Sequence, residues 1–376
     1  MNEELLKKLY SINSPSGKET DMENFVIEFV SGISGVNFWS DKRGNIYAEK
    51  RGSEIGSEFP CIVAHLDEVH TRDFGCHYST QRVGGILFGF DLSTDSFVGC
   101  GADDKNGIFI ALSCLEKYDH IKVAFFVEEE IGCRGSSAAD MSFFKDCRFV
   151  LQADRRNGSD FISRASFVDL CSAEFIADVN MEKFGYKEAA GSMTDVMTLK
   201  ENGLNVSCCN LSCGYYNPHT ENEYTKIYEL NNCLDFVQSI IEGCTKVYKH
   251  NYEKGKWDGY GKWDGYGKWG YNSYGKWGTY GKWGYNSYGK WGYKETDWGL
   301  DESKYLDISD SDLDESDEPK YLDYDKTYNK VVDFIVKLYC ENKEINIDVL
   351  EDEFPLVDFD ILNSAYEEVM GESIYF

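Results

Sequence analysis

Two hydrophobic patterns alternate through residues 1–248: apolar positions at helical spacing, and short unbroken apolar runs. Apolar residues at helical spacing predict a helix over residues 2–10. A Ser-x-x-Glu capping signal, Ser16/Glu19, predicts that a second helix starts there and continues through MENFVIEFV. The chain therefore opens with two helices, ahead of any apolar run long enough for a buried strand.

Later segments continue this alternation. A turn signal at 42–45 precedes the first of four predicted strands, which cover residues 46–52, 60–66, 123–129 and 149–154. Helical spacing predicts helices over 104–117 and 224–247. A further helix is predicted from about Thr194, and residues 202–211 end it and enter a strand. Strands separated by helices favour a three-layer α/β/α sandwich around a mixed, largely parallel sheet. Ligands of such folds gather at the carboxyl ends of the strands.

The pattern changes after residue 248, which divides the chain. Gly-Lys-Trp recurs within residues 255–292, where aliphatic residues are almost absent, so we expect a low-complexity linker over 249–300. An acidic segment over 301–325 is also expected to be disordered. Helical spacing returns further on and predicts a small α-helical segment over 326–376. The catalytic domain is expected to be residues 1–248.

Net charge separates the same regions. The whole chain carries -28, of which about -15 lies in residues 1–248, about +6 in 249–294 and about -19 in 295–376. Such a field repels polyanions, which argues against nucleic acid and anionic membranes as general partners. Lysine and aromatic residues in the linker could stack on single-stranded nucleic acid. A spacer or a self-associating segment is favoured, because an acidic tail adjoins it, and the C-terminal helices could bind a protein partner.

Cysteine usage and the N-terminus bear on the compartment. The 13 cysteines are an odd number without a framework of spacings, which is typical of reduced thiols. The first residues alternate charged and apolar side chains, and no run of about 18 apolar residues occurs. We therefore expect a soluble cytoplasmic protein, with its oligomeric state left open.

Chemically useful residues stand where predicted strands end. His65 follows one strand, with Asp67 two residues later, and a neutral imidazole held by a carboxylate suits Zn²⁺. Asp103 lies in the acidic loop GADDKNG, which opens a helix, where a carboxylate could bridge two cations. Residues 128–130 are three consecutive glutamates, whose mutual repulsion is costly unless cations neutralise them. These three signals predict a metal centre.

Two further ligand candidates complete the pattern. Asp154 ends the strand FVLQAD, and His219 lies in YYNPHTENE. Each alone is weak, since a lone histidine is more often structural and a lone aspartate more often a helix cap. Five nitrogen and oxygen ligands in one chain, all at expected strand ends, reverse that balance.

These motifs resemble a known group of enzymes. AHLDEV, GADDKNG, EEEIGCRG, the strand-end Asp154 and NPHTENE are similar, in this order, to the motifs of the di-zinc aminopeptidase clan, which includes peptidase T, the tetrahedral aminopeptidases and bacterial leucyl aminopeptidases. SINSPSGKE and GSMTD extend the resemblance to roughly residues 5–247. The tail lies outside it.

The resemblance implies a role for each residue. Asp103 would bridge two divalent metal ions, with zinc favoured and cobalt or manganese as alternatives. His65 and Asp154 would complete one metal site, and Glu130 and His219 the other. Two further residues have catalytic assignments. Glu129 would be the general base, chosen over Glu128 by matching Glu-Glu-Ile-Gly to the clan's Glu-Glu-Val-Gly. Asp67 would hold the ring of His65.

The expected reaction is hydrolysis of peptide bonds at the N-terminus of a peptide. A metal-activated water would attack the carbonyl, and the glutamate would move its proton to the leaving amine. The clan's larger members carry an inserted lid or dimerisation domain, whereas the gaps from 65 to 103 and from 154 to 219 are too short for one. A bare catalytic core is therefore expected.

Two other functions remain open at this stage. The same metals would serve a deacylase or carboxypeptidase-like amidohydrolase, and the catalytic region could be a scaffold whose tail recruits partners. Arg155 and Arg156 could receive a substrate carboxylate, although a solvated or ion-pairing role is favoured. Thr194 and Asp195 could line the pocket or support His219, although a helix cap explains them nearly as well. His70 and His77 are alternative ligands to His65.

Overall fold

The computed structural model describes residues 1–52, 58–72 and 76–252. Beyond these it describes only 330–332, 334–335, 345, 349–350, 354 and 359–370. The predicted linker and acidic segment therefore lie outside the described residues, apart from 249–252, and their predictions stay untested.

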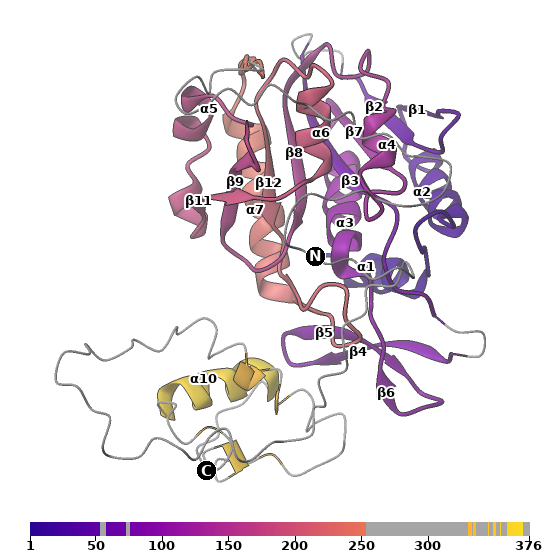
Figure 1. Ribbon diagram of the computed structural model, residues 1–376, viewed down its shortest axis with the longest axis vertical. Helices are drawn as coiled ribbons and strands as arrows, with labels where there is room; N and C mark the ends of the chain where they lie inside the picture. Colours follow the sequence, from indigo (N-terminus) through magenta and orange to yellow (C-terminus); the bar gives the residue numbers. More distant parts are fainter. Residues whose placement is uncertain are drawn as a thin grey trace, which may run out of the picture. The chain divides into compact units, whose positions relative to one another are not determined.

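Helices and strands alternate along most of the described chain (Figure 1). The α-helices are α1 (Glu3–Ser11), α2 (Thr20–Ser31), α3 (Ala102–Lys117), α4 (Arg134–Ser137), α5 (Ala173–Asp178), α6 (Asp195–Glu201), α7 (Ile227–Gly243) and α10 (Phe359–Met370), and η1 (Met181–Phe184) is a 3-10 helix. The strands are β1 (Val36–Ser40), β2 (Ile46–Lys50), β3 (Phe59–His65), β4 (Tyr78–Val83), β5 (Ile86–Asp91), β6 (Ser96–Phe97), β7 (Ile121–Phe126), β8 (Cys147–Arg155), β9 (Asp160–Ala165), β10 (Val168–Asp169), β11 (Lys187–Gly191), β12 (Cys208–Ser212), β13 (Tyr215–Tyr216) and β14 (Tyr224–Lys226).

A nine-stranded mixed sheet forms the centre of the predicted catalytic domain. Its order is β1-β2-β7-β3-β8-β12-β9-β10, and β11 pairs with β9. The four central strands β7, β3, β8 and β12 run parallel to one another. The outer strands β1, β2, β9 and β10 join the sheet through antiparallel pairs. The predicted α/β fold with a mixed, largely parallel sheet is confirmed.

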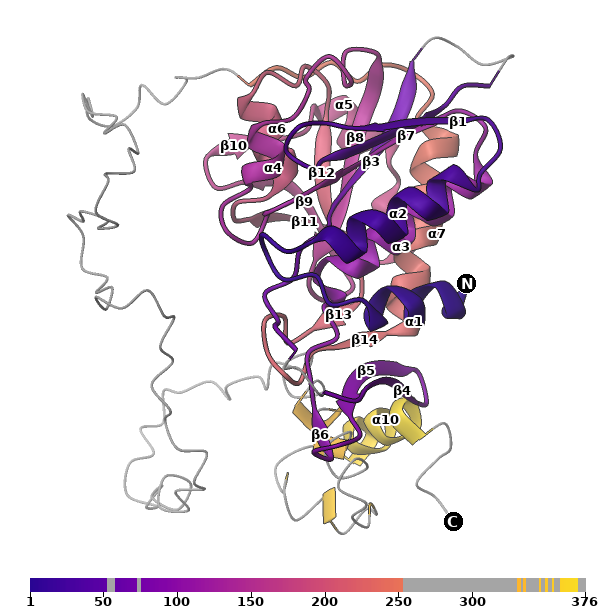
Figure 2. The same ribbon diagram turned by 90° about the vertical axis from the view of Figure 1, so that its right-hand side faces the viewer.

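Helices cover both faces of this sheet. Helices α2, α3 and α7 lie on one side, and α4 and α6 lie on the other (Figure 2). Strands β3 and β7 are buried along their whole length, as expected for central strands covered on both faces. Among the helices that the structure describes, none combines the length and the apolar character needed to cross a lipid bilayer.

A second, smaller sheet was not predicted from the sequence. It has the order β13-β14-β5-β4, with β6 paired to β5. Strands β4 and β5 form a hairpin inside the gap between His65 and Asp103, and β13 and β14 form another, whose connection carries His219. Strand β14 pairs with β5, so the small sheet joins two segments that are far apart in the sequence.

Two local predictions were wrong. Helix α2 starts at Thr20 with Glu19 as its N-cap residue and without a side-chain cap, so the proposed Ser16/Glu19 capping box is absent. The two side chains bond elsewhere: Ser16 donates to Asp67 at 2.7 Å, and Glu19 accepts the backbone N–H of Glu128 at 3.2 Å. The helix predicted over 224–247 is β14 followed by α7, because Tyr224–Lys226 pairs with β5.

Part of the predicted C-terminal helical segment is described. Helix α10 occupies Phe359–Met370, inside the predicted range. Buried side chains of this segment share one hydrophobic cluster with side chains of the small sheet: Val83, Ile86, Phe88, Phe90, Tyr216 and Tyr224 from the sheet, and Val331, Val332, Ile335, Leu350, Leu362, Ala365, Tyr366 and Val369 from the segment.

Candidate metal centre

Sheet register places the first two candidate ligands side by side. Strands β3 and β8 are parallel neighbours with Val63 opposite Gln152, so continuing this register brings His65 next to Asp154. The imidazole Nε2 of His65 lies 3.6 Å from Oδ1 of Asp154, the His65 side chain is buried, and that of Asp154 is only slightly exposed. Because both sit on central strands, their separation is set by backbone hydrogen bonding of the sheet.

Asp103 lies between two histidines, one near each carboxylate oxygen. Its Oδ1 is 3.2 Å from Nε2 of His65, and its Oδ2 is 3.2 Å from Nε2 of His219. The neighbouring Asp104 also lies near His65, but its oxygens accept the backbone N–H groups of His65 and Gly107 at 3.1 and 3.0 Å. Asp103 is therefore the better placed of the two to bridge a pair of cations.

The remaining two candidates meet on the other side of Asp103. Nε2 of His219 lies 2.9 Å from Oε1 of Glu130, although 89 residues separate them in sequence. His219 has a positive φ of 65° in the connection between β13 and β14, and 48% of its side chain is exposed. Glu130 follows β7, so this pair joins the large sheet to the small one.

The charge balance of the cluster fits cations. Burial, reinforced by the charge of Asp103, raises the pKa of Asp154 to about 8. Burial also raises the pKa of Glu129 and that of Glu130. Hydrogen bonds to Asp103 and Glu130 raise the pKa of His219 to about 11. Carboxyls that resist ionisation and imidazoles that hold protons are the expected state of a metal-ligand set without its metal.

The predicted base and its neighbour have distinct environments. Burial is the main cause that raises the pKa of the Glu129 carboxyl, which belongs to neither of the two candidate ligand pairs. The Asp67 carboxylate accepts the backbone N–H of Glu129 at 2.8 Å and of Glu130 at 3.1 Å. Nδ1 of His65 lies 2.9 Å from the backbone carbonyl oxygen of Asp67 and 3.5 Å from its carboxylate. Asp67 thus orients the glutamate loop as well as His65.

Sequence reasoning missed a buried glutamate that holds the Asp103 loop. Glu223 is fully buried and accepts the backbone N–H groups of Gly101 at 2.6 Å and Asp103 at 3.1 Å. Nearby, Lys105 and Glu68 form a buried ion pair with atoms 2.9 Å apart. The signal was present, since Glu223 lies in the motif of His219 and Lys105 in the motif of Asp103. Local sequence does not reveal that the two motifs meet.

The weaker candidates have structural partners. Arg155 pairs with Asp160 at 3.1 Å. The Thr194 hydroxyl donates to Gln152 at 2.6 Å, and Gln152 donates to Asp154 at 3.0 Å, so Thr194 supports Asp154 rather than His219. His70 contacts the carbonyl oxygen of Thr220 at 2.9 Å and lies outside the groups that could hold a metal ion.

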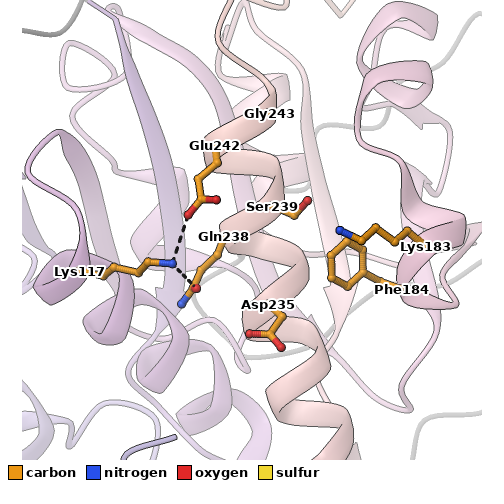
Figure 3. A pocket seen from close by; sticks show the side chains of 8 residues that line it. All are labelled: Lys117, Lys183, Phe184, Asp235, Gln238, Ser239, Glu242 and Gly243. Atoms are coloured by element: carbon orange, nitrogen blue, oxygen red, sulfur yellow. Dashed lines mark hydrogen bonds and ion pairs between the residues drawn. The ribbon is translucent and has the colours of Figure 1, made fainter.

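A separate pocket of about 580 Å³ lies along helix α7 (Figure 3). Lys117, at the end of α3, contributes to it together with Lys183, Gln238 and Glu242, among others, and none of the candidate ligands lines it. Asp103 lies at the opposite end of α3, before a regular helical part (105–117) that spans roughly 20 Å. The pocket is therefore remote from the candidate metal centre.

Solved structures provide the one positive comparison. The aminopeptidase PepT from Bacillus cereus has a TM-score of 0.52 at 15% identity, with 65% of this chain and 100% of that chain covered. A tripeptidase from Staphylococcus aureus has a TM-score of 0.51 at 14% identity, with coverage of 64% and 96%. No protein-family model matches the chain, and no curated protein matches it in sequence. The shared feature is the fold, as the sequence resemblance implied.

Proposed function

We propose that this chain is a two-metal hydrolase that cleaves peptide bonds, acting as an aminopeptidase on the N-terminal residue of peptides. The observation that carries the proposal is the position of Asp103, whose two carboxylate oxygens each lie 3.2 Å from a different histidine. Each histidine has one further carboxylate beside it, Asp154 for His65 and Glu130 for His219. Two equivalent ligand sets around one shared carboxylate favour a pair of divalent cations over a single one.

The ligand chemistry is compatible with zinc. Two imidazoles and three carboxylates bind Zn²⁺ readily and also suit Co²⁺ and Mn²⁺. When bound there, such cations polarise the carbonyl of the scissile bond and lower the pKa of a water molecule towards neutrality.

The remaining work falls to residues of this chain. The Glu129 carboxylate takes the proton of the attacking water and passes it to the departing amine, a role worth roughly 10²–10⁴ in rate. Asp67 fixes the loop that carries this base through the backbone N–H of Glu129. The raised pKa of Glu129 suits a group that both accepts and returns a proton.

The choice of substrate end follows from the two solved peptidases that share the fold, one described as an aminopeptidase and the other as a tripeptidase. A deacylase would use the same metals, so the test must separate the two reactions. We would assay the full chain on aminoacyl anilides and on N-acyl amino acids, with the metal content measured on the same preparation.

Glu129→Gln is the diagnostic variant. We expect about two metal ions per chain in wild type and variant alike, with anilide hydrolysis lowered about 10²–10⁴-fold in the variant. Glu128→Gln is the matched control, because Glu128 pairs with Arg43 and Arg134 rather than with the candidate ligands, and it should retain activity. Absence of bound metal after reconstitution with Zn²⁺, Co²⁺ or Mn²⁺ would refute the proposal.

A further inference from the structure

A second cluster of potential ligands lies behind the proposed base. Ligand atoms of Glu129, Cys133 and Asp195 all lie within 4.8 Å of one another. The Cys133 thiol is 3.2 Å from Oε1 of Glu129, and its side chain is almost completely buried. Cys133 follows Glu129 by one turn of chain, whereas Asp195 is the first residue of α6. None of the roles described above uses Cys133 or Asp195.

The environment of Asp195 is a second, independent indication that this cluster binds a ligand. The residue is fully buried, and its Oδ1 has no hydrogen-bond partner. The other oxygen, Oδ2, accepts a long hydrogen bond from Gln152, at 3.3 Å. An unpartnered buried carboxylate oxygen costs free energy that a positive charge would offset. No lysine or arginine pairs with Asp195 in the part of the chain that the structure describes.

We propose that Glu129, Cys133 and Asp195 form a third binding site for a thiophilic divalent cation such as Zn²⁺. A thiolate and two carboxylates are a ligand set that zinc accepts. With zinc–ligand bonds of about 2.0–2.3 Å, tetrahedral ligands lie about 3.3–3.8 Å apart, so the cluster needs only small shifts to close around the ion. On binding, the thiol loses its proton to solvent, and any proton held by the two carboxyls is also released.

The site has a consequence for hydrolysis, which rests on the proposed function. Glu129 cannot bind a cation and accept a proton from water at the same time. Occupation of the third site therefore inhibits the enzyme. Each of the sites built on His65 and His219 contains an imidazole, whereas this ligand set has none and binds only when a buried thiol loses its proton. We therefore expect it to fill after those two sites. Excess zinc should thus inhibit a protein that needs zinc to act.

Cobalt provides a direct readout of the thiolate. The two proposed catalytic sites contain nitrogen and oxygen ligands alone, so Co²⁺ bound there gives no sulfur-to-cobalt charge-transfer absorption. We would titrate the metal-free full chain with Co²⁺ and record the near-ultraviolet spectrum together with the bound stoichiometry. The expected result is two equivalents without the charge-transfer band and a third equivalent that produces it.

Three variants complete the experiment. Cys133→Ser should abolish the band and leave two bound equivalents, and Asp195→Asn should weaken the third equivalent at least about tenfold. Cys76→Ser is the matched control for thiol binding elsewhere, because Cys76 is more exposed than Cys133, and it should keep the band. For each protein we would measure the Zn²⁺ concentration that halves its own uninhibited rate. This concentration should be at least about tenfold higher for Cys133→Ser than for wild type.

The outcomes separate the two proposals. Two equivalents bound without any band, or a band that persists in Cys133→Ser, would overturn the third site and leave the two-metal hydrolase standing. A thiolate band from the first equivalent onwards would also overturn it, because the cluster would then not be the last site to fill. Failure to bind the first two equivalents would instead refute the proposed function.

Discussion

The two halves of the candidate metal centre are built differently. The inner half, His65 and Asp154, stands on neighbouring strands of the large sheet, and its side chains are 1% and 9% exposed. The outer half, His219 and Glu130, joins a loop of the small sheet to a loop after β7, and the His219 side chain is 48% exposed. Asp103 serves both. Sheet register fixes the inner half, whereas the outer half depends on how two sheets meet.

This difference suggests unequal metal binding. A preformed ligand set loses little conformational entropy when it binds, while an exposed loop must first be ordered. We therefore expect the inner half to bind its cation more tightly than the outer half. Each of the following predictions tests that inequality, starting with the largest effect.

Breaking the inner half should have the largest effect. His65→Ala removes the buried imidazole that lies next to Asp103 and Asp154, so that Asp103 keeps only His219 and Asp154 loses its histidine partner. We expect loss of both cations, because the shared Asp103 loses its fixed partner, and hydrolysis at the background rate. Metal analysis after dialysis and an anilide assay measure this. One firmly retained cation in the variant would contradict the assignment of the tight site to the inner half.

Breaking the outer half should have a smaller effect. His219→Ala should lower the affinity for the cation of the outer half by roughly a hundredfold and leave the cation of the inner half bound. Hydrolysis should be lost at low metal concentration and recover in part when the metal is raised. Isothermal titration of the metal-free variant gives the two affinities. If the affinities for both cations fall equally, the two halves do not bind metal independently, and the inferred difference between them is wrong.

A moderate effect is expected from Glu223, which holds the backbone of Asp103 without touching a ligand atom. Glu223→Gln preserves the shape of a side chain that accepts two N–H groups, of Gly101 and Asp103. Burial raises the pKa of Glu223 to about 7, so the substitution removes its charge at pH 8, where the comparison should be made. Hydrogen bonds to charged groups contribute about 1.5–3 kcal/mol, so metal affinity should fall about tenfold or more. Asp67→Asn is the informative partner, since it loosens the glutamate loop instead and should lower kcat more than metal affinity.

The smallest expected effect is the release of protons when the wild-type protein binds metal. Without metal, the pKa of His219 is about 11 and that of Asp154 about 8, so both hold protons at pH 7. Metal ligation needs the unprotonated forms, so loading at pH 7 should release about two protons or more from these groups and His65. Release by Asp154, in the inner half, should fade as the pH rises above 8, while His219 still releases its proton. Calorimetry in buffers of different ionisation enthalpy measures the number.

Proton release by His219 and by Asp154 should differ in sensitivity to salt. Because nearly half of the His219 side chain is exposed, salt and water screen its ion pairs with Asp103 and Glu130. Added salt should therefore lower the pH at which His219 stops releasing its proton. Asp154 is buried and should respond less. Equal salt sensitivity of the two steps would show that the inner half is as open to solvent as the outer.

Much of the fold was determined by local pattern. Apolar runs lead to His65 and Asp154, interrupted in the second only by Gln152, and such runs are the signature of central parallel strands buried on both faces. The same pattern placed both residues at the carboxyl edge of the sheet, whereas their assignment to one metal site came from the resemblance to the di-zinc aminopeptidase clan. The general architecture and the list of candidate ligands therefore follow from the sequence by itself, whereas the pairing of strands β3 and β8 that brings His65 beside Asp154 comes from the fold.

Only the tertiary structure decided the rest. The small sheet, the pairing of His219 with Glu130 and the hydrogen bonds of Glu223 join segments that are distant in the chain. The same holds for Ser16, whose expected capping role gave way to a bond with Asp67. Hydrogen bonds from side chains to backbone N–H groups of other loops leave no periodic trace in sequence, because their partners are chosen by packing and not by spacing. For this reason the chain's spacing revealed which residues could bind metal, while only the folded molecule showed what holds them in place.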